Sequence, residues 1–156
     1  MLHLIPAPLH RLALRVAYAV RRRYRRIAKP HLFGIAVILR DETGRLLLVR
    51  HTYGPQSWAL PAGGIGRRED PEAGARREMR EELGCELGDM ELLRRFDETL
   101  GTSPHTGWVF SARPLSPPAP DLREIAAIGW FAADDLPAVK LTRVTARRLR
   151  ELGLLQ

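Results

Sequence analysis

Three glutamates, Glu78, Glu81 and Glu82, are spaced so that their carboxylates can act together. On a helix, positions i, i+3 and i+4 share one face, so the three side chains would project in the same direction. Like charges this close repel one another, which is costly unless something positive lies among them. Oxygen ligands without a nearby thiolate or imidazole favour Mg²⁺ or Mn²⁺ over zinc. The pattern indicates a divalent metal site, although an isolated pattern of this kind also fits a solvated, charge-striped helix.

The segment around these glutamates carries the signals of a helix with a defined start and end. Asp70 followed by Pro71 provides a side-chain acceptor at the N-cap and a proline at the first helical position. Gly84 is suited to the residue that ends the helix. We therefore expect a helix over about 71–83. In it Arg77 points about 100° away from Glu78, so it suits one carboxylate or the preceding loop better than all three acids.

The spacing around the helix forms a longer motif that starts at Gly63. Five residues separate Gly63 from Glu69, and the whole stretch to Cys85 spells G-x5-E-x7-R-E-U-x-E-E-x-G-U, where U is a bulky apolar residue. This motif resembles the box of the Nudix hydrolases. Two positions depart from the usual pattern: Cys85 stands where an aliphatic residue is common and can pack as a small hydrophobe, and Gly66-Arg67-Arg68 replaces an acidic-proline-glycine lead. No box carboxylate is missing.

The resemblance implies a fold and a reaction for the chain. The fold would be an α+β protein, a Nudix-like α/β/α sandwich with a mixed β-sheet. The reaction would be hydrolysis of a nucleoside diphosphate linked to another moiety, such as a nucleotide sugar. The resemblance assigns Mg²⁺ or Mn²⁺ as the cofactor and Glu78, Glu81 and Glu82 as catalytic residues and metal ligands. Members of the family use either the acid at the position of Glu78 or one outside the box as the base, and Glu78 ranks first here.

Further residues are expected to shape or complete this site. Glycine lets the backbone approach a metal or phosphate closely, which gives a role to Gly63 and Gly64. Glu69 and Arg77 are expected to tie the loop to the helix. The family often adds an acid from the second half of the chain, for which the candidates are Glu98 and Glu124. Candidate substrate contacts are Tyr53, Trp58 and His105, although Trp58 also fits the core and His105 falls in an expected loop.

The elements expected around the box are mainly strands. The apolar run 32–39 indicates a buried strand, and the turn at 41–44 predicts that it forms a hairpin with 46–49. A loop over 51–57 and a short strand over 58–60 lead to the box. After the box we expect a strand over 90–100, a turn over 101–107, a returning strand over 108–110, a strand over 125–131 and a closing helix over 142–152.

Charge divides the 156-residue chain into two parts. Eight of the 25 Lys and Arg residues lie in residues 1–30, which contain no acid, so 17 basic and 18 acidic residues remain for the other 126, a balance of −1. The net charge of +7 therefore belongs to the N-terminus. We divide the chain into a leader of residues 1–30 and a Nudix hydrolase domain of residues 31–156.

The leader is expected to form a basic amphipathic helix over about 9–28, because apolar residues recur there at helical spacing among arginines. Four interpretations remain open for it. The helix could lie on anionic lipid, track an RNA backbone, serve as a targeting segment, or pack its apolar stripe on the domain or a second subunit of a homodimer. A secretory signal is not favoured, because no uninterrupted apolar core is present.

Two functional alternatives accompany the small-nucleotide hydrolase. One is an RNA 5′-end pyrophosphohydrolase that holds its transcript with the leader. The other is a non-catalytic module that binds nucleotides or associates with a membrane surface; the intact set of glutamates argues against it. The single cysteine excludes an internal disulfide and is consistent with a cytoplasmic protein.

Overall fold

A computed structural model describes residues 13, 16–17, 20, 28–54 and 56–156 of the chain. The predicted basic helix at 9–28 lies mostly outside the described residues. Of that segment only Ala13, Val16, Ala17, Val20 and Ala28 are described, and each is helical. The role of the leader therefore stays a prediction.

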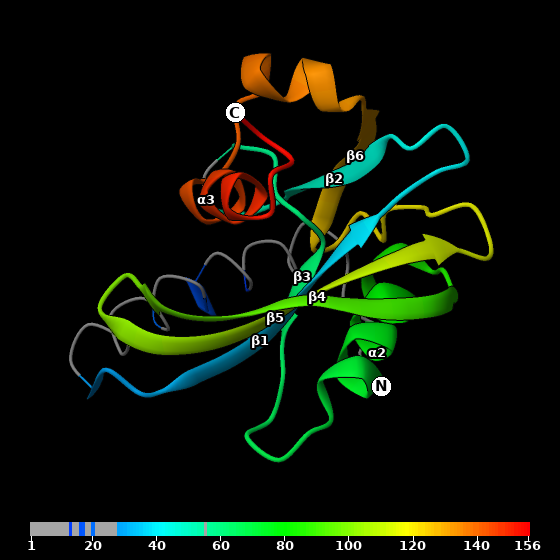
Figure 1. The fold of residues 1–156 in the computed structure, drawn as a ribbon. Coiled ribbons are helices and arrows are strands. Elements are labelled where there is room, and N and C mark those ends of the chain that lie inside the picture. Colours follow the sequence, from blue (N-terminus) through cyan, green and yellow to red (C-terminus); the bar gives the residue numbers. More distant parts are fainter. Residues whose placement is uncertain (1–12, 14–15, 18–19, 21–27, 55) are drawn as a thin grey trace.

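The centre of the fold is a four-stranded mixed sheet in the order β3-β1-β5-β4 (Figure 1). Its strands are β1 (Leu32–Leu39), β3 (Ala62–Gly64), β4 (Leu87–Leu100) and β5 (Ser103–Pro114). β1 pairs antiparallel with β3 and parallel with β5, and β5 pairs antiparallel with β4. Six successive residues at the end of β1 are buried, as expected for an apolar strand covered on both faces.

A second, two-stranded sheet consists of β2 (Leu46–His51) and β6 (Ile125–Phe131), paired antiparallel. The predicted hairpin between 32–39 and 46–49 is therefore wrong. Both edges of β1 are taken by β3 and β5, and only an isolated bridge between Arg40 and Leu46 connects it with the start of β2. The turn predicted from the residues at 41–44 does reverse the chain. The turn residues could not show, however, that strands from elsewhere in the sequence would pair with both edges of β1.

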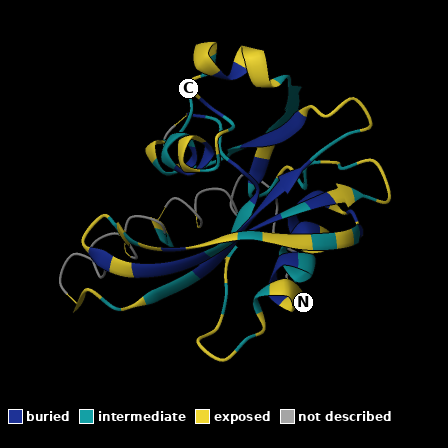
Figure 2. Ribbon diagram, viewed as in Figure 1, coloured by how far each residue is buried: buried dark blue, intermediate teal, exposed yellow. Residues whose placement is uncertain are grey.

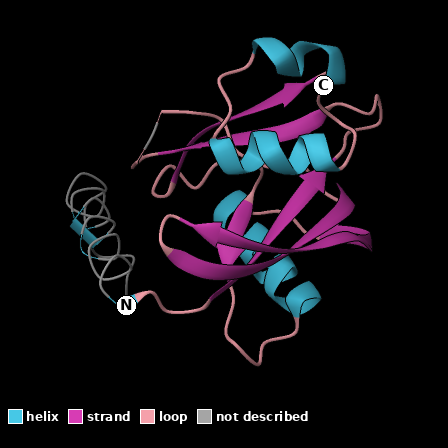
Figure 3. Cartoon of the chain, turned by 60° about the vertical axis from the view of Figure 1, so that its left-hand side comes forward, coloured by secondary structure: helices cyan, strands magenta, loops and turns pink. Residues whose placement is uncertain are grey.

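Two helices lie on opposite faces of the central sheet (Figures 1 and 3). Helix α2 (Pro71–Leu83) packs Ala75, Met79 and Leu83 against one side of β1. Helix α3 (Arg143–Glu151) packs Leu149 against the other side, beside Ala36 and Ile38. A short 3₁₀ helix, η2 (Ala133–Ala138), precedes α3. The buried residues run through the middle of these layers (Figure 2), so the expected α+β sandwich with a mixed sheet is confirmed.

The strand boundaries differ from expectation at two places near the cleft. The turn predicted over 101–107 is much shorter, since β5 already begins at Ser103, so His105 lies in a strand and is buried rather than in an exposed loop. Residues 58–60 form only isolated bridges, from Ala59 to Val49 and from Trp58 to Leu141. Among the helices of the described part of the chain, none is long and apolar enough to span a membrane.

Candidate active site

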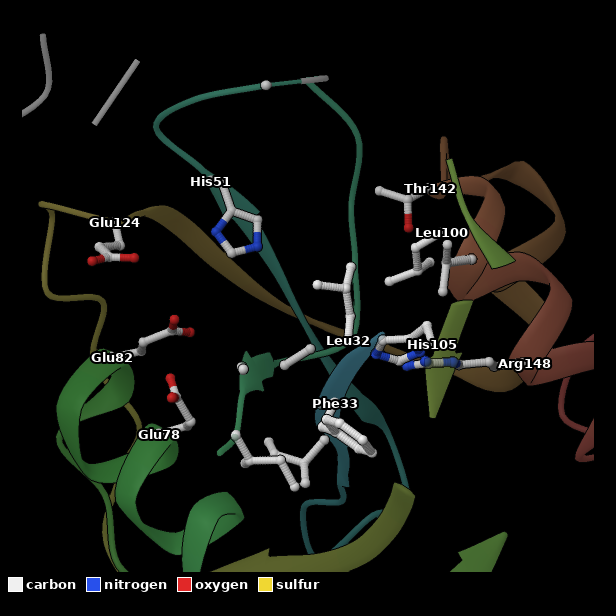
Figure 4. Close-up of a pocket in the computed structure, with 18 of the residues that line it drawn as sticks. Leu32, Phe33, His51, Glu78, Glu82, Leu100, His105, Glu124, Thr142 and Arg148 are labelled. Carbon is white, nitrogen blue, oxygen red and sulfur yellow. The ribbon is translucent and has the colours of Figure 1, made fainter. Parts of the chain in front are cut away.

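An open cleft of about 1380 Å³ lies where the two sheets and the two helices meet. Its wall on one side comes from α2 and the loop before β6, which carry acids. On the other side it comes from β5 and α3, with β1 and β3 between them. Figure 4 shows this division: Glu78, Glu82 and Glu124 lie together, and His105 and Arg148 lie apart from them. The cleft thus has an acidic end and a second end of different chemistry.

Helix α2 presents the acids of the box because its ends are fixed as the sequence predicts. Asp70 accepts a hydrogen bond from the Ala73 backbone N–H at 2.9 Å, and Pro71 is the first helical residue. Gly84 ends the helix at φ 59°, a conformation that glycine adopts easily. The predicted bounds 71–83 are therefore confirmed, and with them the register that places the three box glutamates along one face.

Glu82 is the most buried of these glutamates, with 8% of its surface exposed. Its Oε2 atom is buried and has no hydrogen-bond partner among the described residues. Burial, together with the charges of the neighbouring Glu78, Glu124, Asp121 and Glu81, raises the pKa of Glu82 to about 8. A buried carboxyl surrounded by other carboxyls is unfavourable by itself, so this group is suited to a bound cation.

Glu78 reaches the cleft because residue 63 has no side chain. A Cβ on Gly63 would overlap the Glu78 carboxyl, whereas one on Gly64 would meet nothing within 4 Å. Burial raises the pKa of Glu78, and its ion pair with Arg77 opposes that rise. Of the two glycines expected to shape the site, only Gly63 is in close contact with a box carboxylate.

Arg77 ties the loop before α2 to the helix. Its guanidinium donates to Glu69 Oε1 at 2.9 and 3.1 Å and to Glu78 Oε1 at 2.7 Å, and it lies 3.5 Å from Glu81. Glu69 also accepts from the Gly66 backbone N–H at 2.8 Å, which together with Arg77 lowers its pKa. Among the described residues, Arg77 therefore pairs with Glu69, Glu78 and Glu81 but not with Glu82, and Glu81 is 61% exposed.

Of the two acids proposed to complete the site, Glu124 lies beside the box glutamates and Glu98 does not. Asp121 Oδ1 accepts from the backbone N–H groups of Arg123, Glu124 and Ile125 at 2.9 to 3.0 Å, which fixes the loop that carries Glu124. Glu124 contributes to the raised pKa of Glu82, and Figure 4 shows both pointing into the same space. The sequence signal for this turn is an aspartate directly after a proline-rich connection.

Of the three candidate substrate contacts, two line the cleft and one lies in the core. Tyr53 lines the cleft, and its hydroxyl lies 3.5 Å from Glu124 Oε2. His105 also lines it, at the end away from the acids. Trp58 does not line the cleft; its ring packs edge-on against Phe131 at 5.1 Å, as the core interpretation expected.

Among the lining residues that sequence reasoning missed are His31, Phe33, His51, Arg67 and Arg148. The rings of His31 and Phe33 are stacked with centroids 4.6 Å apart. Burial lowers the pKa of His51, whose Nδ1 atom is buried without a hydrogen-bond partner in the described part of the structure. An imidazole at the end of an apolar strand was the available signal for His51.

A divalent cation fits the acidic end in its donor chemistry. The carboxylates supply hard oxygen ligands, and a cation would be a partner for the Glu82 Oε2 atom, which has none among the described residues. As placed, no three His, Cys, Asp or Glu side chains of the described residues are close enough together to hold a metal ion. A cation would therefore have to draw these carboxylates inward against their mutual repulsion.

Sequence comparison relates the chain to proteins with known names over part of their length. It is 42% identical over 59 residues to an RNA pyrophosphohydrolase of Saccharophagus degradans, covering 38% of this chain and 35% of that protein. It is 32% identical over 109 residues to an ADP-ribose pyrophosphatase of Mycobacterium tuberculosis, covering 65% of this chain and 53% of the relative. The chain thus spans about a third to a half of the length of these relatives.

Structure comparison and a family model agree on the family. The MutT NUDIX hydrolase of Burkholderia pseudomallei has a TM-score of 0.68 and 30% identity, over 77% of this chain and 96% of that one. The NUDIX domain of Shewanella oneidensis NrtR, solved with ADP ribose, has a TM-score of 0.67 at 18% identity, over 79% and 86% of the two chains, and supports the fold. The NUDIX domain model matches residues 30–152. As the box predicted, this chain belongs to the NUDIX family.

Proposed function

We propose that this protein is a metal-dependent pyrophosphohydrolase that cleaves a nucleoside diphosphate linked to another moiety. The observation that carries the proposal is the buried Glu82 carboxyl, whose Oε2 atom has no partner among the described residues and whose neighbours are other acids. Such a group is costly unless it serves a bound cation. The cleft of about 1380 Å³ beside it is large enough for a nucleotide.

Glu78, Glu81 and Glu82, with Glu124 from the facing loop, would hold Mg²⁺ or Mn²⁺. The ion would neutralise phosphate oxygens and lower the pKa of a coordinated water. Glu78 is our first choice for the base that takes the proton of the attacking water. It is held by Arg77 through one oxygen, Oε1, which leaves Oε2 to face the cleft across Gly63. Arg77 and Glu69 keep this loop and helix in one position.

The test is a screen of nucleotide sugars, dinucleotides, nucleoside triphosphates and 5′-triphosphate RNA with Mg²⁺ or Mn²⁺, scoring phosphate-bearing products. We expect hydrolysis of at least one small nucleotide, its loss on chelation, and its loss in Glu82→Gln. The matched control is Glu72→Gln, which removes an exposed carboxylate from the same helix, where it pairs with Arg76. Hydrolysis that persists unchanged in Glu82→Gln would refute the site assignment.

RNA with a 5′-triphosphate is a second candidate substrate. Two observations favour it: the relative from Saccharophagus degradans is named an RNA pyrophosphohydrolase, and eight basic residues without an acid precede the domain. A phosphate backbone would bind such a segment through counterion release, which makes the affinity depend on salt. The small nucleotide remains our first choice because the domain itself has no net positive charge, with a balance of −1.

A further inference from the structure

The end of the cleft away from the acids contains a buried polar cluster that the proposed reaction does not use. Glu98 on β4 is the centre of this cluster, with 4% of its side chain exposed. His105 Nδ1 donates to Glu98 Oε1 at 3.1 Å, and Arg148 of α3 donates to the same oxygen. Arg147 forms an ion pair with Glu98 Oε2. We call His105, Arg148 and Glu98 the distal site.

Two glycines create the space in which the distal site lies. Gly34 of β1 and Gly107 of β5 are direct partners in neighbouring strands. A Cβ on Gly34 would lie 2.9 Å from His105 Nε2, and one on Gly107 would lie 2.7 Å from the Arg148 guanidinium. The imidazole and the guanidinium therefore lie against bare backbone on the floor of the cleft, where Figure 4 shows them side by side.

The cluster has more positive than negative charge. Glu98 is shared by Arg147 and Arg148, and the neighbouring Glu151 is shared by Arg147 at 4.0 Å and Arg94 at 3.5 Å. Three guanidiniums thus face two carboxylates, which leaves one positive charge when His105 is neutral. The acids that line the cleft are Glu78, Glu81, Glu82 and Glu124. Figure 4 shows Glu78, Glu82 and Glu124 at its other end.

The hydrogen-bonding capacity of Arg148 is also incompletely used. A guanidinium has five N–H donors, and the acceptor found for Arg148 among the described residues is Glu98, while its buried Nε has none. Its side chain is 6% exposed. Burial and the nearby Arg147 together lower its pKa to about 10, although Glu151 opposes this shift. An anion that enters the cleft would meet the guanidinium of Arg148, which lines it, and would balance the surplus charge.

We propose that the distal site binds a phosphate group of the substrate other than the two phosphates of the cleaved pyrophosphate. The inference rests on the proposed function, because the scissile pyrophosphate is assigned to the acidic end. A guanidinium fork beside an imidazole matches the geometry and charge of a phosphate. The phosphate could come from a small nucleotide with an additional phosphoryl group or from the first internucleotide link of a short RNA.

The test compares two pairs of substrates in which the second member, called the phosphate-bearing member, carries an additional phosphate; in the second pair this phosphate comes with an additional nucleoside. The first pair is ADP-ribose and 2′-phospho-ADP-ribose, and the second is ATP and the 5′-triphosphorylated dinucleotide pppApA. In Arg148→Gln we expect the KM of the phosphate-bearing member of at least one pair to rise about tenfold or more, as for a lost charge-assisted hydrogen bond. The KM of the other member should change less than about threefold, with kcat nearly constant for both. The pair that responds identifies the source of the phosphate.

Two further variants separate binding from folding. Arg150→Gln removes one exposed positive charge from the same helix and is expected to leave the KM values unchanged, since Arg150 does not line the cleft. Arg148→Lys keeps the charge next to Glu98 but loses the fork, so it should fold and still raise the KM of the phosphate-bearing substrate. Equal changes for both members of both pairs would overturn the proposal.

A binding measurement tests the distal site independently of turnover. Inorganic phosphate is titrated into the full-length protein without divalent ions, while the Arg148 Nε–H resonance is followed by NMR. We expect a saturable shift that is absent in His105→Gln or greatly weakened there, and a resonance that does not respond would overturn the inference. If the wild type cleaved no substrate but this shift were observed, the proposed function would fail and the distal site would stand.

Discussion

At position 63 the site depends on a missing side chain. A methyl group there would occupy the space of the Glu78 carboxyl, whereas position 64 opens onto free space. Because Glu78 is flexible at its far end, the methyl group would displace the carboxylate rather than unfold the protein. The site therefore requires glycine at position 63, whereas position 64 has room for a side chain.

This difference predicts the effect of adding one methyl group at each position. Gly63→Ala should lower kcat by about 100-fold or more, because a misplaced catalytic group can cost that much, with little change in the melting temperature. Gly64→Ala serves as the comparison and should lose far less. Steady-state kinetics with the substrate found in the screen checks both, and equal losses would contradict the steric explanation.

Glu82 predicts how stability depends on pH when no divalent ion is bound. Its pKa of about 8 lies above the ordinary value of 4.5, so the folded state holds this proton more tightly than the unfolded chain does. The stabilisation is complete below about pH 4.5 and is lost as the pH rises through about 8.

In EDTA, we expect the free energy of unfolding from urea titrations to fall between about pH 5 and 9, by on the order of a few kcal/mol. Glu82→Gln should flatten this part of the profile, because the amide does not titrate. Glu72→Gln should keep the slope of the wild type. Parallel profiles for wild type and Glu82→Gln would show that Glu82 titrates normally.

At the scale of elements, helix α2 does two things at once. One face packs Ala75, Met79 and Leu83 into the core, and the adjoining face presents carboxylates to the cleft. The burial of the apolar face therefore offsets the destabilisation of the helix by its mutually repelling carboxylates. The Asp70 cap holds the first turn of this helix, next to the loop that Arg77 and Glu69 brace.

Removal of this cap should be measurable as a loss of stability. Asp70→Ala is expected to lower the free energy of unfolding by about 1 kcal/mol, since a backbone N–H of the first turn loses its acceptor. Asp70→Ser should recover most of that loss because its hydroxyl can accept the same hydrogen bond. Urea denaturation measures both, and an unchanged midpoint in Asp70→Ala would show that the cap contributes nothing.

At the scale of the whole molecule, charge is segregated rather than spread. The leader carries the surplus of positive charge, while the domain is nearly neutral, and the four acids that line the cleft lie at one end of it. If RNA is a substrate, the leader and not the domain should account for the salt dependence of binding.

Replacing five leader arginines by glutamine tests this division in the full chain. Single-stranded RNA binding loses about 0.7 in the slope of log affinity against log salt for each phosphate contact removed, so the slope should become shallower by roughly 3 to 4. Hydrolysis of a small nucleotide should stay the same. The replaced residues are Arg21, Arg22, Arg23, Arg25 and Arg26. An unaltered slope would show that these arginines do not contact the RNA backbone.

The sequence alone was sufficient to predict the features that depend on residues close together in the chain. The caps, the proline and the i, i+3, i+4 spacing fixed α2 and the common face of its glutamates, and the box identified the family. The apolar run of β1 was also readable, because burial on both faces requires a continuous apolar segment.

The tertiary structure decided what depends on residues far apart in the chain. β2 pairs with β6 rather than with β1 because distant strands occupy both edges of β1. Glu98 and Glu124 had equal standing as acids in the sequence, but β4 directs Glu98 to Arg147 and Arg148, while a turn fixed by Asp121 brings Glu124 to the box. Long-range pairing set these outcomes: a strand or a turn can be recognised from its own residues, but which distant segment it will meet cannot.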